Sequence, residues 1–251
     1  MRLNGLRALV TGSTSGIGKA IAIRFAQEGA SVTVHGIEDE AGKAVASSIN
    51  GRYLRADLSD PSACSQLIQE AGQIDILVNN AAIVPRGNLE STDPELFDRA
   101  MAVNARAPLL LIKAALPGFR AAGGGSVLNI GSVNAYCGEP GLLAYSMTKG
   151  ALMTLTRNLG DALGPDLVRM NQLNLGWVLT EREQIDQEKS GKPPDWPSHL
   201  PKRFCPSGKL YTPEEIANFA LAFVEPGGFV TGAVVELEQY PVIGRNPPKT
   251  L

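Results

Sequence analysis

The sequence predicts an α/β fold, a doubly wound and mostly parallel sheet of seven strands with helices on both faces. Two observations predict it. Short runs of Ala, Val, Leu and Ile with little alternation suit strands that are buried on both faces. Longer helical patterns separate these runs, and such an alternation is typical of a parallel sheet built from right-handed crossovers.

The elements follow one another in a regular order along the chain. Apolar runs predict strands over 6–11, 31–36, 53–56, 74–78, 126–130 and 168–175, and a last strand ends at 237–240. Helical patterns lie between them, over 17–28, 38–49, 61–71, 94–121 and 144–163. A further helix is expected to begin at Thr212-Pro-Glu-Glu215, which has the pattern of a capping box.

Composition excludes several classes of protein. The 251 residues are 44% hydrophobic, which is enough for one large domain over 1–251. A formal charge of −2 provides no basic field for nucleic acid, and no 18-residue apolar run predicts a membrane span. Cys64, Cys137 and Cys205 are odd in number and widely spaced, so neither a disulfide framework nor a metal site is expected. We therefore expect a cytoplasmic protein with a small-molecule substrate and no metal.

A glycine-rich turn follows the first predicted strand. It runs from Thr11 to Gly18 with the spacing GxxxGxG and leads directly into a helix. Glycines at such a turn let a pyrophosphate approach the backbone, and the helix N-terminus offers N–H groups and a partial positive charge. A Walker A loop is excluded because Ser13 and Ala20 occupy positions that need Gly and Ser or Thr. The turn therefore predicts dinucleotide binding.

A tyrosine and a lysine open the helix predicted over 144–163. Tyr145 and Lys149 are four residues apart and so lie on one helix face. A phenol has an ordinary pKa of about 10, and a nearby cation favours the phenolate. The pair is therefore a candidate for general acid–base chemistry at an alcohol or carbonyl oxygen.

The segment 181–206 interrupts the alternation of strands and helices. It carries many charges, five prolines, Trp196 and His199. Long loops at the carboxyl ends of strands are commonly functional, so we interpret the segment as a substrate lid. A solvated surface excursion is the alternative.

With the glycine turn, the tyrosine–lysine pair and Ser132 thirteen residues before Tyr145, the chain resembles the short-chain dehydrogenase/reductase family over about residues 5–235. The resemblance implies a single-domain Rossmann fold. Its motifs occur in the family's order: Thr11 to Gly18, Asp57-Leu58, Asn79 to Ala82, the four catalytic positions Asn104, Ser132, Tyr145 and Lys149, and Gly176 to Thr180.

The resemblance also implies what each residue does. Tyr145 acts as acid or base, Lys149 lowers its pKa and holds the nicotinamide ribose, and Ser132 orients the substrate oxygen. Asn104 holds a water that links Lys149 to solvent, and Thr180 bonds the carboxamide. The implied cofactor-binding residues are Gly12, Ser15, Gly16, Ile17, Gly18, Ile37, Glu38, Asp57, Leu58, Asn80, Ala81, Tyr145, Lys149, Gly176, Val178 and Thr180.

The residues after the second predicted strand bear on the choice between NAD and NADP. An acid commonly binds the 2′-hydroxyl of NAD, and a basic side chain the 2′-phosphate of NADP. By resemblance, Gly36 and Ile37 replace both determinants. Glu38 stands where it would repel a phosphate, so we expect NAD, with NADP as the alternative. Glu38 is also explained as an exposed residue early in a helix, where acids are favoured.

The substrate pocket is expected at the carboxyl ends of the strands, beside the lid. Its expected residues are Ser132, Asn134, Tyr145 and Trp177. Asn134 and Glu139 favour a sugar or polyol, and Arg86 could pair with an acid group.

Three function classes follow from these residues. The first is an NAD(P)-dependent oxidoreductase acting on a secondary alcohol or ketone, preferably a sugar or polyol. The second is an NADPH-dependent reductase of a carrier-bound 3-oxoacyl group, and the third is a non-enzymatic dinucleotide-binding regulator. Leu175, Gln172 and the end at Leu237 to Tyr240 depart from the family pattern. A homo-oligomer, tetramer or dimer, is expected from the resemblance, and the altered end bears on its assembly.

Overall fold

A computed structural model describes residues 1–202 and 205–240 and contains one seven-stranded sheet. The strand order is β3-β2-β1-β4-β5-β6-β7, and every neighbouring pair is parallel. The order reverses direction between β1 and β4, as in a doubly wound Rossmann sheet. The predicted fold class is therefore confirmed, with a sheet that is parallel throughout.

The strands lie close to their predicted positions. They are β1 (Arg7–Val10), β2 (Ser31–Gly36), β3 (Arg52–Arg55), β4 (Ile76–Asn79), β5 (Gly125–Ser132), β6 (Val168–Leu175) and β7 (Val234–Leu237). The helices are α1 (Gly16–Gln27), α2 (Asp39–Ser48), α3 (Pro61–Ala71), α4 (Pro94–Met101), α5 (Ala107–Ala121), α6 (Asn134–Cys137), α7 (Leu143–Ala162), α8 (Glu181–Lys189) and α9 (Pro213–Val224). Short 3₁₀ turns span Gly164–Asp166 and Trp196–His199.

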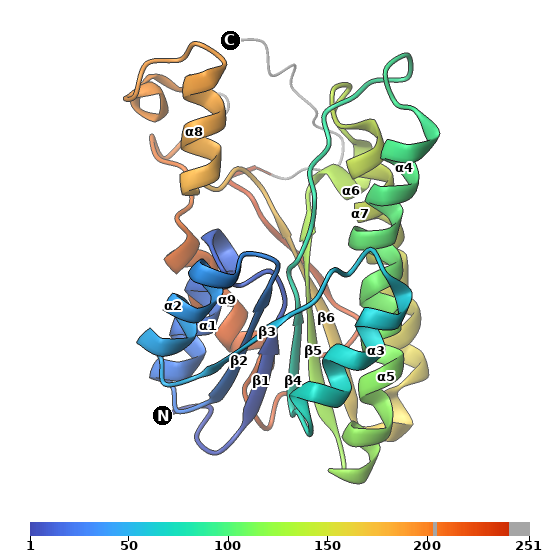
Figure 1. Ribbon diagram of the computed structural model, residues 1–251. Coiled ribbons are helices and arrows are strands. Elements are labelled where there is room, and N and C mark those ends of the chain that lie inside the picture. Colours follow the sequence, from blue (N-terminus) through green and yellow to red (C-terminus); the bar gives the residue numbers. More distant parts are fainter. Residues whose placement is uncertain (203–204, 241–251) are drawn as a thin grey trace.

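Helices cover both faces of the sheet in two layers (Figure 1). On one face, α1, α2 and α9 bury Ile21, Phe25 and Leu221 against the strands. On the other, α3 and α5 bury Leu67 and Phe119 in a second core. Burial on both faces explains why the strands read as continuous apolar runs. None of the helices in the described part of the chain is long and apolar enough to cross a membrane.

The prediction of one regular helix over 94–121 is wrong. A π-helical turn, Ala102–Arg106, separates α4 from α5. Pro108 has no N–H for the carbonyl of Asn104, and its ring crowds that carbonyl, so the regular ladder cannot continue there. The wider turn carries Asn104, which is 1% exposed. Such turns are frequent at functional sites.

The segment 181–206 contains a helix that was not predicted from the sequence. Helix α8 begins after Thr180, whose hydroxyl accepts from the backbone N–H of Glu183, and Arg182 pairs with Asp186 one turn later. The charged sequence of α8 showed no apolar face that would predict a helix, because α8 buries no residue in the main core. Trp196, Leu200 and Cys205 of the segment instead form a small apolar cluster with Leu210, which lies just after it, and Trp177 and Leu179 pack against this cluster.

The last strand is shorter than predicted, since β7 ends at Leu237 and not at Tyr240. The next residues turn to the 181–206 segment and the residues just after it. The Gln239 amide donates to the Lys209 carbonyl and accepts from the Ser207 N–H, and the Tyr240 hydroxyl donates to the Lys202 carbonyl at 2.6 Å. The altered end of the sheet thus supports this segment.

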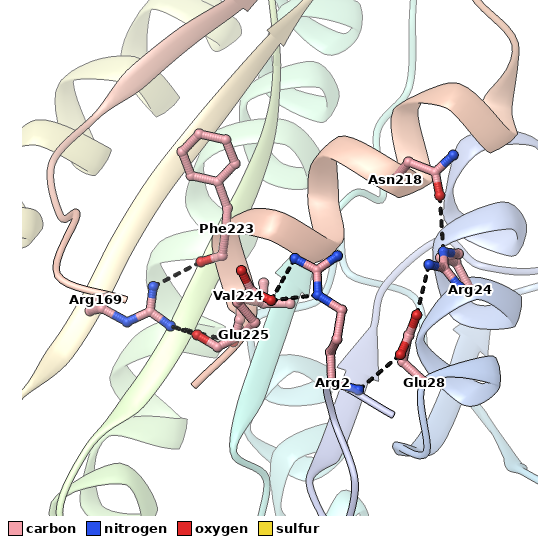
Figure 2. A network of polar contacts seen from close by, with 8 residues as sticks. All are labelled: Arg2, Arg24, Glu28, Arg169, Asn218, Phe223, Val224 and Glu225. Atoms are coloured by element: carbon pink, nitrogen blue, oxygen red, sulfur yellow. Dashed lines mark hydrogen bonds and ion pairs between the residues drawn. The ribbon is translucent and has the colours of Figure 1, made fainter. Parts of the chain in front are cut away.

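A polar network fixes the carboxyl end of α9 (Figure 2). The Arg169 guanidinium, from β6, donates to the carbonyls of Phe223, Val224 and Glu225 at 2.9, 3.3 and 2.9 Å. The last carbonyls of a helix have no partner within the helix, so a side chain from β6 replaces those bonds. The Glu225 carboxylate meanwhile pairs with Arg2. Helix α9 is thereby tied to the sheet and to the N-terminus.

His35, the fifth residue of β2, joins the glycine turn to β2 and to the residue after β3. Its Nδ1 accepts from the Gly12 N–H at 3.2 Å, so the ring proton lies on Nε2, which faces the Ala56 carbonyl at 3.1 Å. The Ser13 N–H donates to the His35 carbonyl, and the His35 N–H donates to the Ser13 hydroxyl. Burial lowers the pKa of this 2% exposed ring to about 4. The imidazole is therefore neutral at physiological pH.

We predict that Arg169→Met lowers the free energy of unfolding by about 3 kcal/mol, because three helix-end carbonyls lose a charged donor. Denaturant unfolding measures the change. Arg120→Met is the matched control, since Arg120 pairs with Asp166 at the exposed surface. Equal effects of the two substitutions would contradict the role given to Arg169.

We also predict an acid-sensitive stability centred on His35. The unfolded histidine takes up a proton near pH 6.5, whereas the folded one does so only near 4. The unfolded state binds more protons between these values, so the free energy of unfolding falls as pH falls through this window, by up to about 3 kcal/mol. In denaturant unfolding at several pH values, His35→Gln should lack this contribution. Parallel pH profiles for the two proteins would refute it.

Candidate active site

The residues predicted to act together meet at the carboxyl ends of the strands on either side of the switch between β1 and β4. The glycine turn follows β1, Asn80 and Ala81 follow β4, Ser132 ends β5, and Gly176 follows β6. This edge of an open α/β sheet is where ligands bind. Strand order alone therefore assembles residues that are far apart in the sequence.

The glycine turn lies directly against the end of β4. Gly12 has φ +60°, and a Cβ built on it would lie 2.7 Å from the Ala81 Cα. A Cβ on Gly18 would lie 2.2 Å from the Gly12 carbonyl oxygen and 2.4 Å from the Asn80 amide. Neither distance admits a side chain, so both glycines are required by close approach. Gly16 has φ +53° and faces Thr180, whose Cγ2 is 3.6 Å from a built Cβ.

Asn80 holds this contact together. Its Nδ2 donates to the Thr11 and Gly12 carbonyls at 2.9 and 2.8 Å. The Thr11 hydroxyl accepts from the backbone N–H groups of Asn80 and Ala81. The two predicted cofactor residues Asn80 and Ala81 thus also keep the turn in shape.

The N-terminus of α1 has the chemistry of an anion site. Ser15, at the N-cap, makes no capping bond through its exposed side chain, and no acidic residue lies in the first turn. The free N–H groups and the helix dipole are therefore not neutralised from within the protein. A pyrophosphate fits this end of the helix, beside Gly16 and the partly buried Ile17.

Tyr145, Ser132 and Lys149 form a compact group between β5 and α7. Burial raises the pKa of Tyr145 to about 12, and its hydrogen bond with Ser132 acts in the opposite direction. The Ser132 hydroxyl also accepts from the Asn134 N–H at 3.2 Å. The serine is therefore oriented by Asn134, which the sequence placed beside the substrate.

Lys149 lies near the tyrosine ring, with Nζ 5.5 Å from its centroid. The ammonium donates to the Ile130 carbonyl at 2.7 Å and is 3% exposed. Burial lowers its pKa to about 8. Desolvation dominates the pKa of Tyr145, and the contribution that opposes it comes from Ser132.

The Asn104 side chain joins the π-helical turn to the loop after β4. Its Oδ1 accepts from the Ile83 N–H, and its Nδ2 donates to the Ile83 carbonyl and to the Thr148 hydroxyl. Thr148 directly precedes Lys149, so Asn104 ties α7 to the loop after β4 at the turn that carries the lysine.

A chain of buried side chains lies beneath this group and explains the polar Gln172 within β6. It runs from Asn79 to Asn129 at 2.8 Å, on to Thr156 at 2.8 Å, to Gln172 at 2.8 Å and to Asn174 at 2.6 Å. Gly131 passes over its end, where a Cβ would lie 2.1 Å from the Asn174 Oδ1. Gly131 stands between Ile130, which accepts from Lys149, and Ser132. The network therefore supports the end of β5.

The residues expected near the adenosine lie around the end of β2. Glu38 is exposed, and its Oε2 accepts from the Thr14 hydroxyl at 2.9 Å, which holds the carboxylate over the glycine turn. Ile37 is 51% exposed. After β3, Leu58 is buried, and the exposed Asp57 accepts from the Ser59 N–H, which lowers the pKa of that carboxyl.

Arg55 is a basic residue of this region that the sequence reading did not select. Its Nε lies 3.4 Å from the Ile37 carbonyl and 3.6 Å from the Asp39 carboxylate. It ends β3, which pairs with β2, so only the sheet register brings it to the adenosine end. A basic residue on a neighbouring strand has no fixed spacing from the glycine turn, and this explains the omission.

The segment expected at the nicotinamide leads into α8. Gly176 lies against Glu238, since a Cβ built on it would lie 2.2 Å from that carboxylate. Val178 is buried and is bridged to Tyr211, whereas Thr180 caps α8. The Trp177 indole N–H donates to Glu183, which directs this ring toward the 181–206 segment.

Comparison with known proteins gives the context for this geometry. A family model described as "Enoyl-(Acyl carrier protein) reductase" matches residues 12–238. D-xylose 1-dehydrogenase of Caulobacter vibrioides is 34% identical over 224 residues, which cover 87% of this chain and 88% of the relative.

Two solved structures share the whole architecture. A 3-oxoacyl (acyl-carrier-protein) reductase from Agrobacterium tumefaciens with NADP bound has a TM-score of 0.87 at 32% identity, covering 94% of this chain and 93% of that one. A 3-ketoacyl-(acyl-carrier-protein) reductase from Brucella melitensis complexed with NADH has a TM-score of 0.83 at 30% identity, covering 94% and 97%. The chain belongs to the short-chain dehydrogenase/reductase family of oxidoreductases.

Proposed function

We propose that this protein is an NAD(P)-dependent oxidoreductase that interconverts a secondary alcohol and a ketone, with a sugar or polyol as substrate. The observation that carries the proposal is the group of Tyr145, Ser132 and Lys149 at the carboxyl edge of the sheet, beside a glycine turn able to hold a pyrophosphate. A sugar dehydrogenase among the relatives supports the substrate class.

The chain's own residues would move and hold the proton. In alcohol oxidation the Tyr145 phenolate takes the hydroxyl proton, and in ketone reduction the phenol returns it. Ser132 donates to the substrate oxygen and orients it toward Tyr145. Lys149 lies near the tyrosine ring, and a cation in this position would favour the phenolate. A bound nicotinamide dinucleotide supplies or accepts the hydride.

The cofactor would lie across the switch between β1 and β4. The α1 N-terminus, Gly12, Gly16 and Gly18 would hold its pyrophosphate, and Asp57 and Leu58 would flank the adenine. Lys149 would bond the nicotinamide ribose. Thr180 holds the carboxamide, and its position beside Gly16 supports this role.

NAD is the preferred cofactor in this proposal. The Glu38 carboxylate, held by Thr14, presents a negative charge where NADP carries its 2′-phosphate. Arg55 is the residue that would accept that phosphate if NADP were used, although Asp39 lies beside its guanidinium. NADP therefore remains the alternative.

The 181–206 segment would act as a lid over the substrate. Its support is the bond from Trp177 to Glu183, which joins the nicotinamide-facing segment to α8. The proposal extends to a homo-oligomer, dimer or tetramer, in the cytoplasm.

Reduction of a carrier-bound 3-oxoacyl group is the second candidate function. It is favoured by the names of two solved structures that share the fold. The third class, a regulator without activity, is less well supported because Asn104, Ser132, Tyr145 and Lys149 are all retained.

We expect Tyr145→Phe to lose turnover by about 100-fold or more and to keep its affinity for the cofactor, because only the proton-transferring hydroxyl is removed. Reduced-nicotinamide absorbance with sugars, polyols and a 3-oxoacyl thioester measures turnover, and cofactor titration measures binding. Tyr211→Phe is the control. Turnover close to wild type in Tyr145→Phe would eliminate the mechanism.

We expect Glu38→Gln to raise kcat/KM with NADP relative to NAD by roughly tenfold, since it removes about 1.4 kcal/mol of repulsion from the 2′-phosphate. Glu40→Gln, two residues further on in the first turn of α2 and exposed, should leave the ratio unchanged. If the wild-type protein preferred NADP and Arg55→Met abolished that preference, the proposed choice of NAD would be wrong and NADP would be the cofactor.

A further inference from the structure

Gln172 is a buried amide that has no role in the proposed chemistry, yet it lies between the elements that carry the reacting group. It belongs to β6 and is 0% exposed. Its Oε1 accepts from the Thr156 hydroxyl of α7 at 2.8 Å, and its Nε2 donates to the Asn174 Oδ1 at 2.6 Å. A buried amide is costly unless both of its ends are bonded, so these two bonds fix where the side chain lies.

Thr156 joins this amide to the side of α7 that carries the candidate catalytic residues. Tyr145, Lys149 and Thr156 occupy positions i, i+4 and i+11 of the helix, and residues at this spacing lie along one side of it. The Thr156 hydroxyl also accepts from the Asn129 amide of β5 at 2.8 Å. One threonine therefore ties this side of α7 to both β5 and β6.

The Gln172 amide also lies against the end of β5. A Cβ built on Gly131 would lie 2.4 Å from the Gln172 Nε2, so no side chain separates the amide from the strand. Gly131 stands between Ile130, whose carbonyl accepts from the Lys149 ammonium at 2.7 Å, and Ser132. A displaced amide at position 172 would therefore shift the backbone that bonds the lysine and carries the serine.

The hydrogen bonds of this network all run in one direction. Each side chain donates to the next, in the order Asn79, Asn129, Thr156, Gln172 and Asn174. Each bond of such a chain strengthens its neighbours, so the loss of Gln172 would weaken more than its own two bonds. The Thr156 hydroxyl also lies 2.9 Å from the Leu152 carbonyl of its own helix, to which it would turn once Gln172 is removed. The link between α7 and β6 would then be lost.

We propose that Gln172 is a positioning residue for the proposed reaction: it fixes α7 through Thr156 and the end of β5 through Gly131, so that the candidate catalytic side chains face each other. Such a role rests on the proposed function and extends it to a residue outside the reacting group. Proton and hydride transfer need closely aligned groups, so a small displacement of α7 against β5 is enough to slow the reaction.

The first test replaces Gln172 by methionine, which has a similar length and no amide. In Gln172→Met we expect kcat to fall by about tenfold or more, because the reacting groups are no longer aligned. The Kd of NAD should stay unchanged, since Asn80 and His35 still fasten the glycine turn. Reduced-nicotinamide absorbance with sugars, polyols and a 3-oxoacyl thioester measures kcat, and titration of the full-length protein with NAD measures the Kd.

Asn171→Leu is the matched control. Asn171 is the preceding residue of β6 and is also 0% exposed, and its amide bonds the Val230 carbonyl and the Ala233 N–H, away from α7. Denaturant unfolding should show a loss of stability in both variants, whereas kcat should fall only in Gln172→Met.

Two substitutions at Thr156 test the same link independently, including the case in which Gln172→Met does not fold. Thr156→Val has the same shape without the hydroxyl and should lower kcat as Gln172→Met does. Thr156→Ser retains the hydroxyl and should remain close to wild type. Equal kcat values for the valine and serine variants would contradict the role of this link.

The pH dependence gives a readout that a loss of stability would not move. Burial raises the pKa of Tyr145, and its hydrogen bond with Ser132 opposes that rise. A displaced serine opposes it less, so the pH midpoint of alcohol oxidation, which needs the phenolate, should move to higher pH in Gln172→Met and Thr156→Val. The midpoint should be unchanged in Asn171→Leu.

Amide hydrogen exchange detects the positioning without turnover. In the full-length protein, with and without NAD, Gln172→Met should speed exchange in 125–132 and in 143–156, because the end of β5 and the catalytic side of α7 lose a common support. Asn171→Leu should instead speed exchange around 230–233, where its amide is bonded.

The two kinds of measurement separate this role from the proposed function. If the wild-type protein turned over none of the compounds while exchange changed as expected, the proposed chemistry would be wrong and the positioning by Gln172 would stand. If the wild-type protein were active and Gln172→Met kept its kcat and pH midpoint, or lost no more kcat than Asn171→Leu, the positioning role would be wrong and the chemistry would stand.

Discussion

The candidate site depends on the close approach of the turn after β1 to the end of β4. A single methyl group on Gly12 or Gly18 would collide with backbone, and Asn80 with Thr11 fastens the two segments. This contact leaves the α1 N-terminus open at the switch point of the sheet, where a pyrophosphate fits. His35 secures the same turn from the other side, so the cradle is held by two neighbouring strands.

The reacting group depends on a second kind of constraint, a fully buried set of polar side chains. The chain from Asn79 to Asn174 and the bonds of Asn104 hold β5 and α7 in register, so that Ser132 and Tyr145 face each other. Buried polar groups are costly when unpaired, so a connected network specifies one arrangement of these elements. This requirement explains why two polar residues lie where an apolar one would be expected, Asn104 on the π-helical turn and Gln172 within a strand.

The 181–206 segment differs from the sheet in what stabilises it. It packs on the two tryptophans and is supported by Gln239 and Tyr240. The altered C-terminal end therefore has a local structural role. The same segment holds Lys192 against the rings of Trp177 and Trp196.

The sequence by itself determined the fold class, the positions of most helices and strands, and the residues of the candidate site. These depend on apolar periodicity, on the spacing of glycines and on a tyrosine and a lysine one helical turn apart, all of which are local properties of the chain. It did not determine α8, the π-helical turn or the end of β7, since these depend on caps, on Pro108 beside a buried Asn104, and on contacts with distant segments. Only tertiary structure decided that Arg55 reaches the end of β2 through the sheet register. Contacts of this kind join segments that are far apart in the chain, and they leave no fixed spacing in the sequence.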